Sequence, residues 1–186
     1  GHDVYAYDNL CKGHKESVPA GRLIVGNIND YDKLCAVFKE KQIEAVMHFA
    51  SYIAVGESCE KPREYYDNNI SASLTLLNAM TDCGVKKMLF SSTAAVFAPL
   101  ADGDDALTED SPKAPDSPYA FSKFALERII DHYSKAYGLG FTILRYFNAC
   151  GADTDGSFGE AHDPETHLIP LVLQVPLGQR EFIGVF

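Results

Sequence analysis

Short runs of β-branched and aromatic residues alternate along this chain with longer stretches of helical periodicity, and this alternation limits the possible folds most strongly. The runs expected to form strands are 3–7, 22–25, 45–49, 87–91 and 141–146. The stretches expected to form helices are 31–41, 65–83 and 120–137, and a glycine follows each of the last two, as is usual where helices stop. Strands that alternate with helices predict a parallel sheet with helices on both faces, in the doubly wound, Rossmann-like arrangement.

The start of the expected sheet is missing from the sequence. A dinucleotide-binding fold of this kind begins with a strand and G-x-G-x-x-G, whereas this chain runs at once into a strand that ends at Asp8. The absent first strand would lie in the centre of the order 3-2-1-4-5-6, so two half-sheets with unpaired inner edges are expected. We therefore expect a truncated sequence. Asp8 stands where the second strand should finish, and there it either binds a ribose or only starts a turn with Asn9.

Composition and charge exclude several classes of function. The 16 basic and 26 acidic residues leave a net charge of −10, which disfavours nonspecific binding to nucleic acid or to an anionic membrane. No apolar run approaches the roughly 20 residues that span a bilayer. The five cysteines are scattered and form no C-x-x-C pair, so neither a metal site nor a disulfide framework is expected, and a reducing cytoplasm is favoured.

Tyr119 and Lys123 are four residues apart at the head of an expected helix. Residues at this spacing share a helix face, so the phenol and the ammonium can belong to one site. A free tyrosine has a pKa of about 10, and a fixed cation nearby would lower that pKa enough for the tyrosine to act as a base. The structural alternative is a packed tyrosine beside an exposed lysine.

Hydroxyl side chains follow the expected strand 87–91, at Ser91, Ser92 and Thr93. The carboxyl ends of parallel strands face the crevice where such sheets bind ligands, although serine and threonine there can also cap a helix. Together with Tyr119 and Lys123, these hydroxyls match the arrangement of the Ser/Thr–Tyr–Lys triad of short-chain dehydrogenases.

Motifs along the whole chain resemble, in order, those of the UDP-glucose 4-epimerases, which belong to the extended short-chain dehydrogenase/reductase family. They are HFAS at 48–51, VGES at 55–58, KP at 61–62, YYDNN at 65–69, FSSTAAV at 90–96, RYFN at 145–148, GA at 151–152 and THLIP at 166–170. The resemblance implies a truncated NAD-binding domain over 1–150 and the start of a substrate-binding lobe over 151–186. It further implies conversion of UDP-glucose to UDP-galactose through a 4-keto sugar with bound NAD, in galactose metabolism, by a cytoplasmic homodimer.

The resemblance also implies roles for single residues. Thr93 matches the catalytic hydroxyl, Tyr119 the base, and Lys123 the lysine that binds the nicotinamide ribose. The other positions implied to line the NAD site are Asp8, Asn9, Asn27, Ile28, Phe49, Ala50, Ser51, Asn68, Ser91 and Tyr146. Besides Thr93 and Tyr119, the positions implied to touch the UDP-sugar are Asn148, His167 and Leu168. His48, alone on an apolar strand, is expected to be a core histidine.

Some residues depart from the family's pattern. Asn27 stands where many relatives carry an aspartate that touches adenine, Ile53 where some carry a lysine, and Phe97-Ala98 replaces the usual Tyr-Gly. Nucleotide-sugar 4,6-dehydratases also resemble the chain, but they place Asp-Glu after the catalytic threonine, and Ala94-Ala95 stand there.

Two alternatives stay open. One is a UDP-hexose 4-epimerase for N-acetylated or uronic sugars, and the other is a non-catalytic remnant of the fold. The 186 residues alone are expected to be inactive, because no glycine-rich turn binds the cofactor pyrophosphate.

Overall fold

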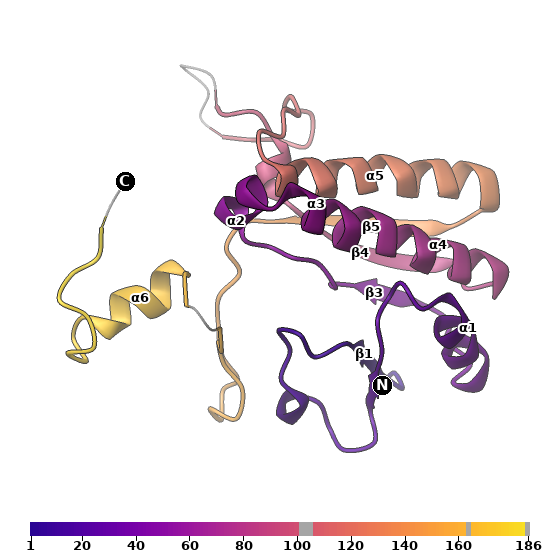
Figure 1. Ribbon diagram of the computed structural model, residues 1–186, viewed down its shortest axis with the longest axis horizontal. Coiled ribbons are helices and arrows are strands. Elements are labelled where there is room, and N and C mark those ends of the chain that lie inside the picture. The colour runs from indigo at the N-terminus through magenta and orange to yellow at the C-terminus, as the bar shows by residue number, and fades with distance from the viewer. Residues whose placement is uncertain (101–105, 163–164, 185–186) are drawn as a thin grey trace.

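A computed structural model describes residues 1–100, 106–162 and 165–184, and this part of the chain forms a layered α/β fold (Figure 1). Neighbouring strands pair in parallel, which confirms the expected fold class. The strands are Ala6–Asp8 (β1), Leu23–Val25 (β2), Val46–His48 (β3), Lys87–Thr93 (β4) and Gly140–Tyr146 (β5). All five lie where the sequence pattern predicted them, within a few residues at each end.

The strands form two separate sheets, as expected. One has the order β1-β2 and the other the order β3-β4-β5. The interruption falls between β1 and β3, where the doubly wound order 3-2-1-4-5-6 places its first strand. The inner edges of β1 and β3 therefore face each other without a ladder of backbone hydrogen bonds between them.

Helices occur in all three stretches where they were expected. The helices are Tyr31–Glu40 (α1), Val55–Glu60 (α2), Pro62–Tyr65 (α3), Ala72–Asp82 (α4), Pro118–Tyr137 (α5) and Leu168–Gln174 (α6), with 3-10 turns at Lys15–Ser17 (η1) and Ala94–Val96 (η3). Of these, α2 and α6 were not predicted. The stretch 65–83 was expected to be one helix, but a π-helical turn, Tyr66–Ser71 (η2), joins α3 to α4. Such turns insert a residue into a helix and occur often at functional sites.

Helices α4 and α5 lie over one face of β3-β4-β5, and α1 packs beside α4 (Figure 1). The core between these layers consists of Leu34, Phe38, Leu76, Leu77, Ala79, Met80, Val85, Met88, Phe90, Leu126, Ile130 and Leu139. Helices were expected on both faces, but within the described ranges the opposite face of this sheet lies open. Met47, which points to that face, is 62% exposed.

None of the described helices is long and apolar enough to cross a membrane.

Local signals at both ends explain where α5 begins and ends. The Ser117 hydroxyl accepts a hydrogen bond from the Ala120 amide at 3.2 Å, and Pro118 occupies the first helical position. Gly138 ends the helix in the left-handed conformation at φ 70°.

The segment from Pro99 to Pro118 was expected to be a surface loop, and its residues 101–105 lie outside the described part. The remainder folds back on η3 through the backbone hydrogen bond from Ala114 to Val96.

Leu77 provides a test of this core. Its side chain is 0% exposed, so Leu77→Ala leaves a cavity and should lower the free energy of unfolding by about 2–5 kcal/mol. Leu173, on α6, is 55% exposed, and Leu173→Ala should change that free energy by no more than about 0.5 kcal/mol. Urea unfolding followed by circular dichroism measures both variants, and equal effects would contradict the described packing.

Candidate active site

The structure brings the three predicted catalytic residues together at the carboxyl end of β4. Thr93 is the last residue of β4, Tyr119 lies in the first turn of α5, and Lys123 follows one turn later. All three side chains are buried, with Lys123 only 2% exposed. The Lys123 ammonium lies 5.9 Å from the centre of the Tyr119 ring, and the Thr93 hydroxyl lies close enough to the phenol to lower its pKa. This juxtaposition of hydroxyl, phenol and ammonium is the one that the sequence pattern predicted.

Lys123 links the ends of two neighbouring strands. Its Nζ donates to the Ser51 hydroxyl, in the loop after β3, and to the backbone carbonyl of Ser91, in β4, both at 2.8 Å. The ammonium also lies 5.1 Å from the centre of the Phe90 ring. Burial lowers the pKa of Lys123 to about 8, because it removes the solvation of the charged form.

The expected lowering of the Tyr119 pKa is not found. Burial raises the pKa of the phenol above its ordinary value, and the Thr93 hydroxyl only partly opposes this effect. Both described hydrogen bonds of the Lys123 ammonium go to Ser51 and Ser91 and not to the phenol. Desolvation therefore outweighs the hydrogen bond from Thr93, and in the chain by itself burial favours the protonated form of the phenol.

The three serine and threonine residues at the end of β4 make different contacts. Thr93 accepts a hydrogen bond from the Ala95 amide at 3.2 Å, so it caps η3 as well as facing the phenol. Ser92 points to the other face of the strand and donates to Glu127 at 2.5 Å. Ser91 contributes its backbone carbonyl to Lys123. Both interpretations of this motif, capping and site formation, are therefore realised in the structure.

A partly buried ion pair joins α5 to β5 near the site. The Glu127 carboxylate of α5 accepts from Arg145 Nε at 2.9 Å and from Nη2 at 2.7 Å, and it also accepts from Ser92. Arg145 is on β5 and pairs in addition with Glu109 at 3.0 Å. The carboxylate raises the pKa of Arg145. Sequence analysis missed Glu127, although an acid on the apolar face of a helix was a usable signal.

Asn69 is a second residue that sequence analysis missed. It lies in η2, is 1% exposed, and donates to the Tyr52 carbonyl at 3.0 Å and to the Ser122 hydroxyl at 3.1 Å. Its side-chain oxygen accepts from the Tyr52 amide at 2.8 Å and from Asn68 at 3.0 Å. All four hydrogen-bonding capacities of this amide are thus satisfied. Asn69 holds the loop after β3 against α5 and so positions Ser51 near Lys123.

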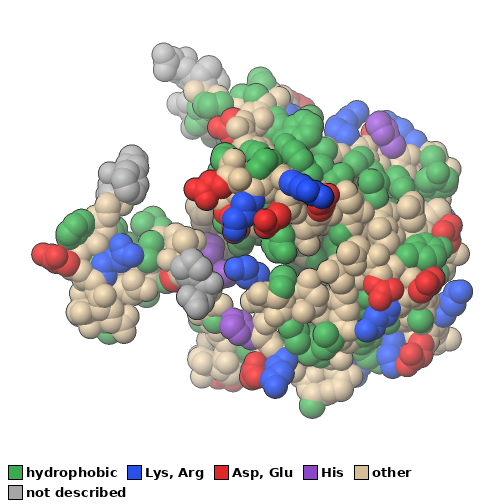
Figure 2. Space-filling view, in the orientation of Figure 1, with side chains coloured by type: hydrophobic (Ala, Val, Ile, Leu, Met, Phe, Trp, Pro, Cys, Tyr) green, Lys and Arg blue, Asp and Glu red, His purple; other side chains and the backbone are tan. Residues whose placement is uncertain are grey.

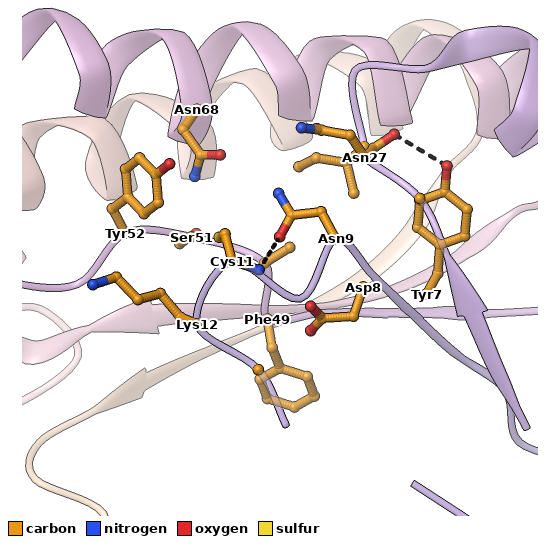
Figure 3. Close-up of a pocket in the computed structure, with 14 residues that line it drawn as sticks. Tyr7, Asp8, Asn9, Cys11, Lys12, Asn27, Phe49, Ser51, Tyr52 and Asn68 are labelled. Atoms are coloured by element: carbon orange, nitrogen blue, oxygen red, sulfur yellow. Dashed lines mark hydrogen bonds between the residues drawn. The ribbon is translucent and has the colours of Figure 1, made fainter. Parts of the chain in front are cut away.

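A pocket lies beside these residues, between the ends of β1 and β2 and the loop after β3 (Figure 3). Its volume is about 150 Å³, below the roughly 300–1,000 Å³ of typical ligand sites, so the described walls enclose only part of a large ligand. Residues predicted to contact a cofactor form much of the lining: Asp8, Asn9, Asn27, Ile28, Phe49, Ala50, Ser51 and Asn68. Tyr7, Cys11, Lys12, Gly13, Gly26 and Tyr52 also line it and were not predicted.

Asp8 and Asn9 form a turn and line the pocket at the same time. Asp8 Oδ1 accepts from the Leu10 amide at 2.6 Å, and Asn9 Oδ1 accepts from the Cys11 amide at 3.0 Å. A Cβ atom at Gly13 would lie 3.0 Å from both Asp8 carboxylate oxygens, so the absence of a side chain there keeps the carboxylate accessible. The turn interpretation is therefore confirmed without excluding a ligand contact.

The predicted sugar-side residues lie apart from this site. Tyr146 ends β5 in register with Thr93, but Asn148 follows in an exposed segment. His167 precedes α6, and Leu168 is 68% exposed within it. Figure 1 shows α6 separated from the helical layers. Among the residues that the structure describes, no hydrogen bond joins Asn148, His167 or Leu168 to the catalytic group.

His48 is a core histidine, as expected. It is 3% exposed, and its Nε2 lies 2.8 Å from the Ser73 hydroxyl of α4. Burial, followed by the charge of Lys123, lowers the pKa of His48 to about 3, so this imidazole is neutral at physiological pH.

Comparisons with known proteins agree with this geometry. The sequence model of the NAD dependent epimerase/dehydratase family matches residues 1–182. The chain is 44% identical over 187 residues to a UDP-glucose 4-epimerase of Lacticaseibacillus casei, and the match covers 100% of the chain and 56% of that protein. It is 47% identical over 188 residues to a UDP-glucose 4-epimerase of Corynebacterium glutamicum, covering 100% and 55%. The chain thus spans little more than half the length of these curated relatives.

Solved structures give the same result. A UDP-glucose 4-epimerase crystal structure superposes with a TM-score of 0.90 at 46% identity, over 95% of this chain and 54% of that one. The Brucella ovis UDP-glucose 4-epimerase, solved in complex with NAD, superposes with a TM-score of 0.91 at 38% identity, over 95% and 54%. The Bifidobacterium longum UDP-glucose 4-epimerase, solved with NAD⁺ and UDP, has a TM-score of 0.86 at 34% identity, over 97% and 57%.

The buried Lys123 predicts a pH dependence of stability. Its pKa is about 8 in the folded chain and 10.5 when unperturbed, so between these values the unfolded chain binds more protons and stability rises with pH. Lys123→Met removes the ammonium and with it this contribution to the pH dependence of stability. The unfolding free energy of Lys123→Met minus that of the parent should therefore fall between pH 8 and 10.5, by at most about 1.4 kcal/mol per pH unit. Urea unfolding at several pH values measures this difference, with Lys135→Met, at an exposed site, as the control.

Proposed function

The chain belongs to the NAD-dependent epimerase/dehydratase family, and on that premise we propose that it carries the catalytic group of a UDP-glucose 4-epimerase. This enzyme interconverts UDP-glucose and UDP-galactose by reversible hydride transfer at sugar C4, through a 4-keto sugar. The observation that carries the proposal is the convergence of Thr93, Tyr119 and Lys123 beside a pocket formed by the end of β1 and the loop after β3. Identities of 44% and 47% to curated UDP-glucose 4-epimerases support it.

NAD is the cofactor that the pocket suits. The Asp8 carboxylate and the amide side chains of Asn9 and Asn27 line it and suit ribose hydroxyls and an adenine edge. Lys123 donates a hydrogen bond to Ser51, which lines the pocket, and would bind the nicotinamide ribose. When bound, NAD supplies the hydride acceptor for sugar C4 and, in its oxidised form, a positive charge next to the phenol.

Tyr119 is the proposed proton acceptor for the sugar 4-hydroxyl. Because burial raises the pKa of the phenol in the chain alone, the tyrosine needs an additional positive charge nearby before it can act as a base. Thr93 lies beside the phenol and would orient the reacting oxygen. Lys123, held by Ser51 and Ser91, fixes the position of its ammonium relative to both groups. Asn148, His167 and Leu168 are the proposed contacts of the UDP portion.

The domain division and the assembly of the protein belong to the same proposal. Residues 1–150 would form the NAD-binding domain, and residues from 151 onward would begin the substrate lobe, which agrees with the separate position of α6 (Figure 1).

A homodimer would form through the outer faces of α4 and α5. Phe121 is 47% exposed and Tyr66 36% exposed, and their rings meet edge to face at 6.2 Å. Figure 2 shows hydrophobic side chains on the surface formed by α5. A cytoplasmic location remains a prediction.

Replacement of the proposed base is the direct test. In the complete protein, Tyr119→Phe should lower kcat for UDP-galactose by about 10²–10⁴-fold, because proton transfer by a positioned side chain contributes about that much. Binding of UDP, measured by calorimetry, should change little. Tyr137→Phe, which alters an exposed tyrosine on the same helix, is the control and should keep its activity. Near-normal turnover by Tyr119→Phe would contradict the assignment.

The Asp8 carboxylate should determine the choice of cofactor. A negative charge at the adenosine ribose accepts hydrogen bonds from its hydroxyls and repels the 2′-phosphate of NADP. Asp8→Ala in the complete protein should therefore weaken NAD⁺ binding by at least about tenfold, and NADP⁺ binding by much less. Fluorescence titration with both nucleotides measures the ratio, with Asp116→Ala, at an exposed loop residue, as the control. An unchanged ratio in Asp8→Ala would place the ribose elsewhere.

A further inference from the structure

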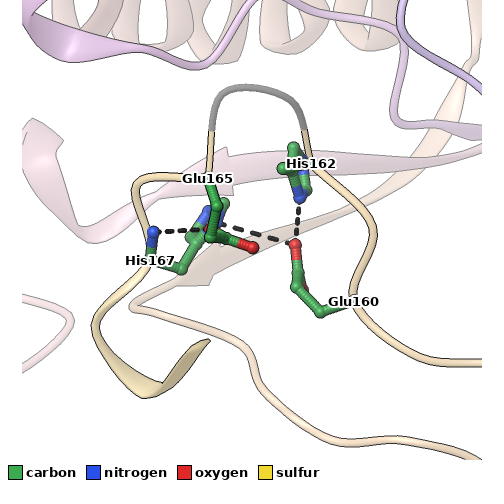
Figure 4. A group of neighbouring side chains, drawn as sticks. All are labelled: Glu160, His162, Glu165 and His167. Atoms are coloured by element: carbon green, nitrogen blue, oxygen red, sulfur yellow. Dashed lines mark hydrogen bonds and ion pairs between the residues drawn. The ribbon is translucent and has the colours of Figure 1, made fainter. Parts of the chain in front are cut away.

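Four side chains converge just before α6, apart from the group formed by Thr93, Tyr119 and Lys123 (Figure 4). They are Glu160, His162, Glu165 and His167, and each offers one ligand atom within 4.8 Å of the other three. His167 Nδ1 lies 2.9 Å from Glu165 Oε1 and 3.6 Å from Glu160 Oε1, while His162 Nδ1 contacts the same Glu160 oxygen. One carboxylate oxygen is therefore shared between two imidazoles. We propose that these four residues form a zinc-binding site.

The kind of ligand atoms points to zinc. Two imidazole nitrogens and two carboxylate oxygens make a four-coordinate set of the type that Zn²⁺ accepts, whereas Mg²⁺ and Ca²⁺ prefer oxygen ligands alone. His162 and His167 are separated by four residues, within the H-x₃₋₅-H spacing of zinc sites. Sequence analysis considered only the cysteines and therefore expected no metal.

The distances allow the site to close with small movements. Zinc bonds of about 2.0–2.1 Å place tetrahedral ligand atoms roughly 3.3 Å apart, so the most distant pair of the cluster must approach by about 1.5 Å. The side chains have the freedom for this shift, because His162 is 44% exposed and Glu160 and His167 are each 33% exposed. The imidazole rings already lie 4.6 Å apart.

The charges favour a divalent cation. Two carboxylates would neutralise Zn²⁺, and in the described part of the chain neither Glu160 nor Glu165 forms an ion pair with a lysine or arginine. The chain as a whole carries a net charge of −10, which attracts cations. In the chain without metal, the carboxylates are held by the imidazoles, and the cation would replace that contact.

A contact with the main body of the protein helps to position the cluster. His14 Nε2 lies 3.1 Å from the carbonyl oxygen of Ala161, between the first two ligands. His14 belongs to the segment after β1 that also forms part of the pocket wall through Lys12 and Gly13. Figure 2 shows histidine side chains in the region where the α6 segment meets the main body. His167 is also a proposed contact of the UDP portion, so zinc and the nucleotide would compete for this side chain, and zinc binding is therefore measured without any substrate.

Calorimetric titration of the metal-free 186-residue chain with Zn²⁺ tests the proposal. We expect one equivalent to bind, and visible d–d absorption of Co²⁺ in the same protein to report nitrogen ligands. His162→Ala/His167→Ala should weaken zinc binding by more than roughly tenfold, since even outer contacts of a metal site contribute about 10–100-fold. His2→Ala/His132→Ala removes two exposed histidines elsewhere and is the matched control.

Two results would overturn the proposal: no saturable zinc binding by the parent chain, or equal losses in the two double variants. Glu160 and His162 are exposed, Glu165 and His167 are partly buried, and none of the four belongs to the hydrophobic core, so replacement of the histidines should leave the far-UV circular dichroism unchanged. If the double histidine variant does not fold, Glu165→Gln provides the second measurement, because it keeps the shape of the side chain and removes one anionic ligand. Unchanged zinc affinity in Glu165→Gln would equally contradict the site.

Discussion

The burial of one ammonium group governs the geometry of the candidate site. Lys123 is 2% exposed, and its charge is held by the Ser51 hydroxyl and the Ser91 carbonyl. An isolated buried cation is strongly unfavourable, so these hydrogen bonds must be kept, and they tie the loop after β3 and the end of β4 to α5. The lost solvation lowers the pKa of this ammonium to about 8.

Two polar clusters make this arrangement rigid. Glu127 and Arg145 form a partly buried ion pair between α5 and β5, and Ser92 connects the pair to β4. Because the buried Glu127 carboxylate accepts hydrogen bonds from both Ser92 and Arg145, it ties the ends of β4 and β5 to the helix. Asn69 does the same for the loop that carries Ser51, because all of its hydrogen bonds are satisfied. The proposed catalytic side chains are therefore positioned by polar contacts of neighbouring residues.

The electrostatics of Tyr119 connect the site to its cofactor. Burial protects the phenol from water but raises its pKa, and the nearby ammonium is turned towards other oxygens. In this arrangement proton transfer depends on a charge that the described residues do not contribute. The proposal of a bound oxidised nicotinamide meets this requirement, and it explains why the Y-x-x-x-K spacing is a necessary but not a sufficient part of the site.

The sequence by itself determined the class of fold, the order of its strands and main helices, and which residues were proposed as the catalytic group. Apolar periodicity depends on local geometry, so the positions of β1 to β5 and of α5 were predictable, as was the interruption of the sheet. Only the tertiary structure decided the pKa of Tyr119, the partners of Lys123, the roles of Glu127 and Asn69, and the convergence of Glu160 and His162 with Glu165 and His167. These properties depend on burial and on contacts between residues distant in the chain, and neither periodicity nor spacing encodes how much water a side chain loses.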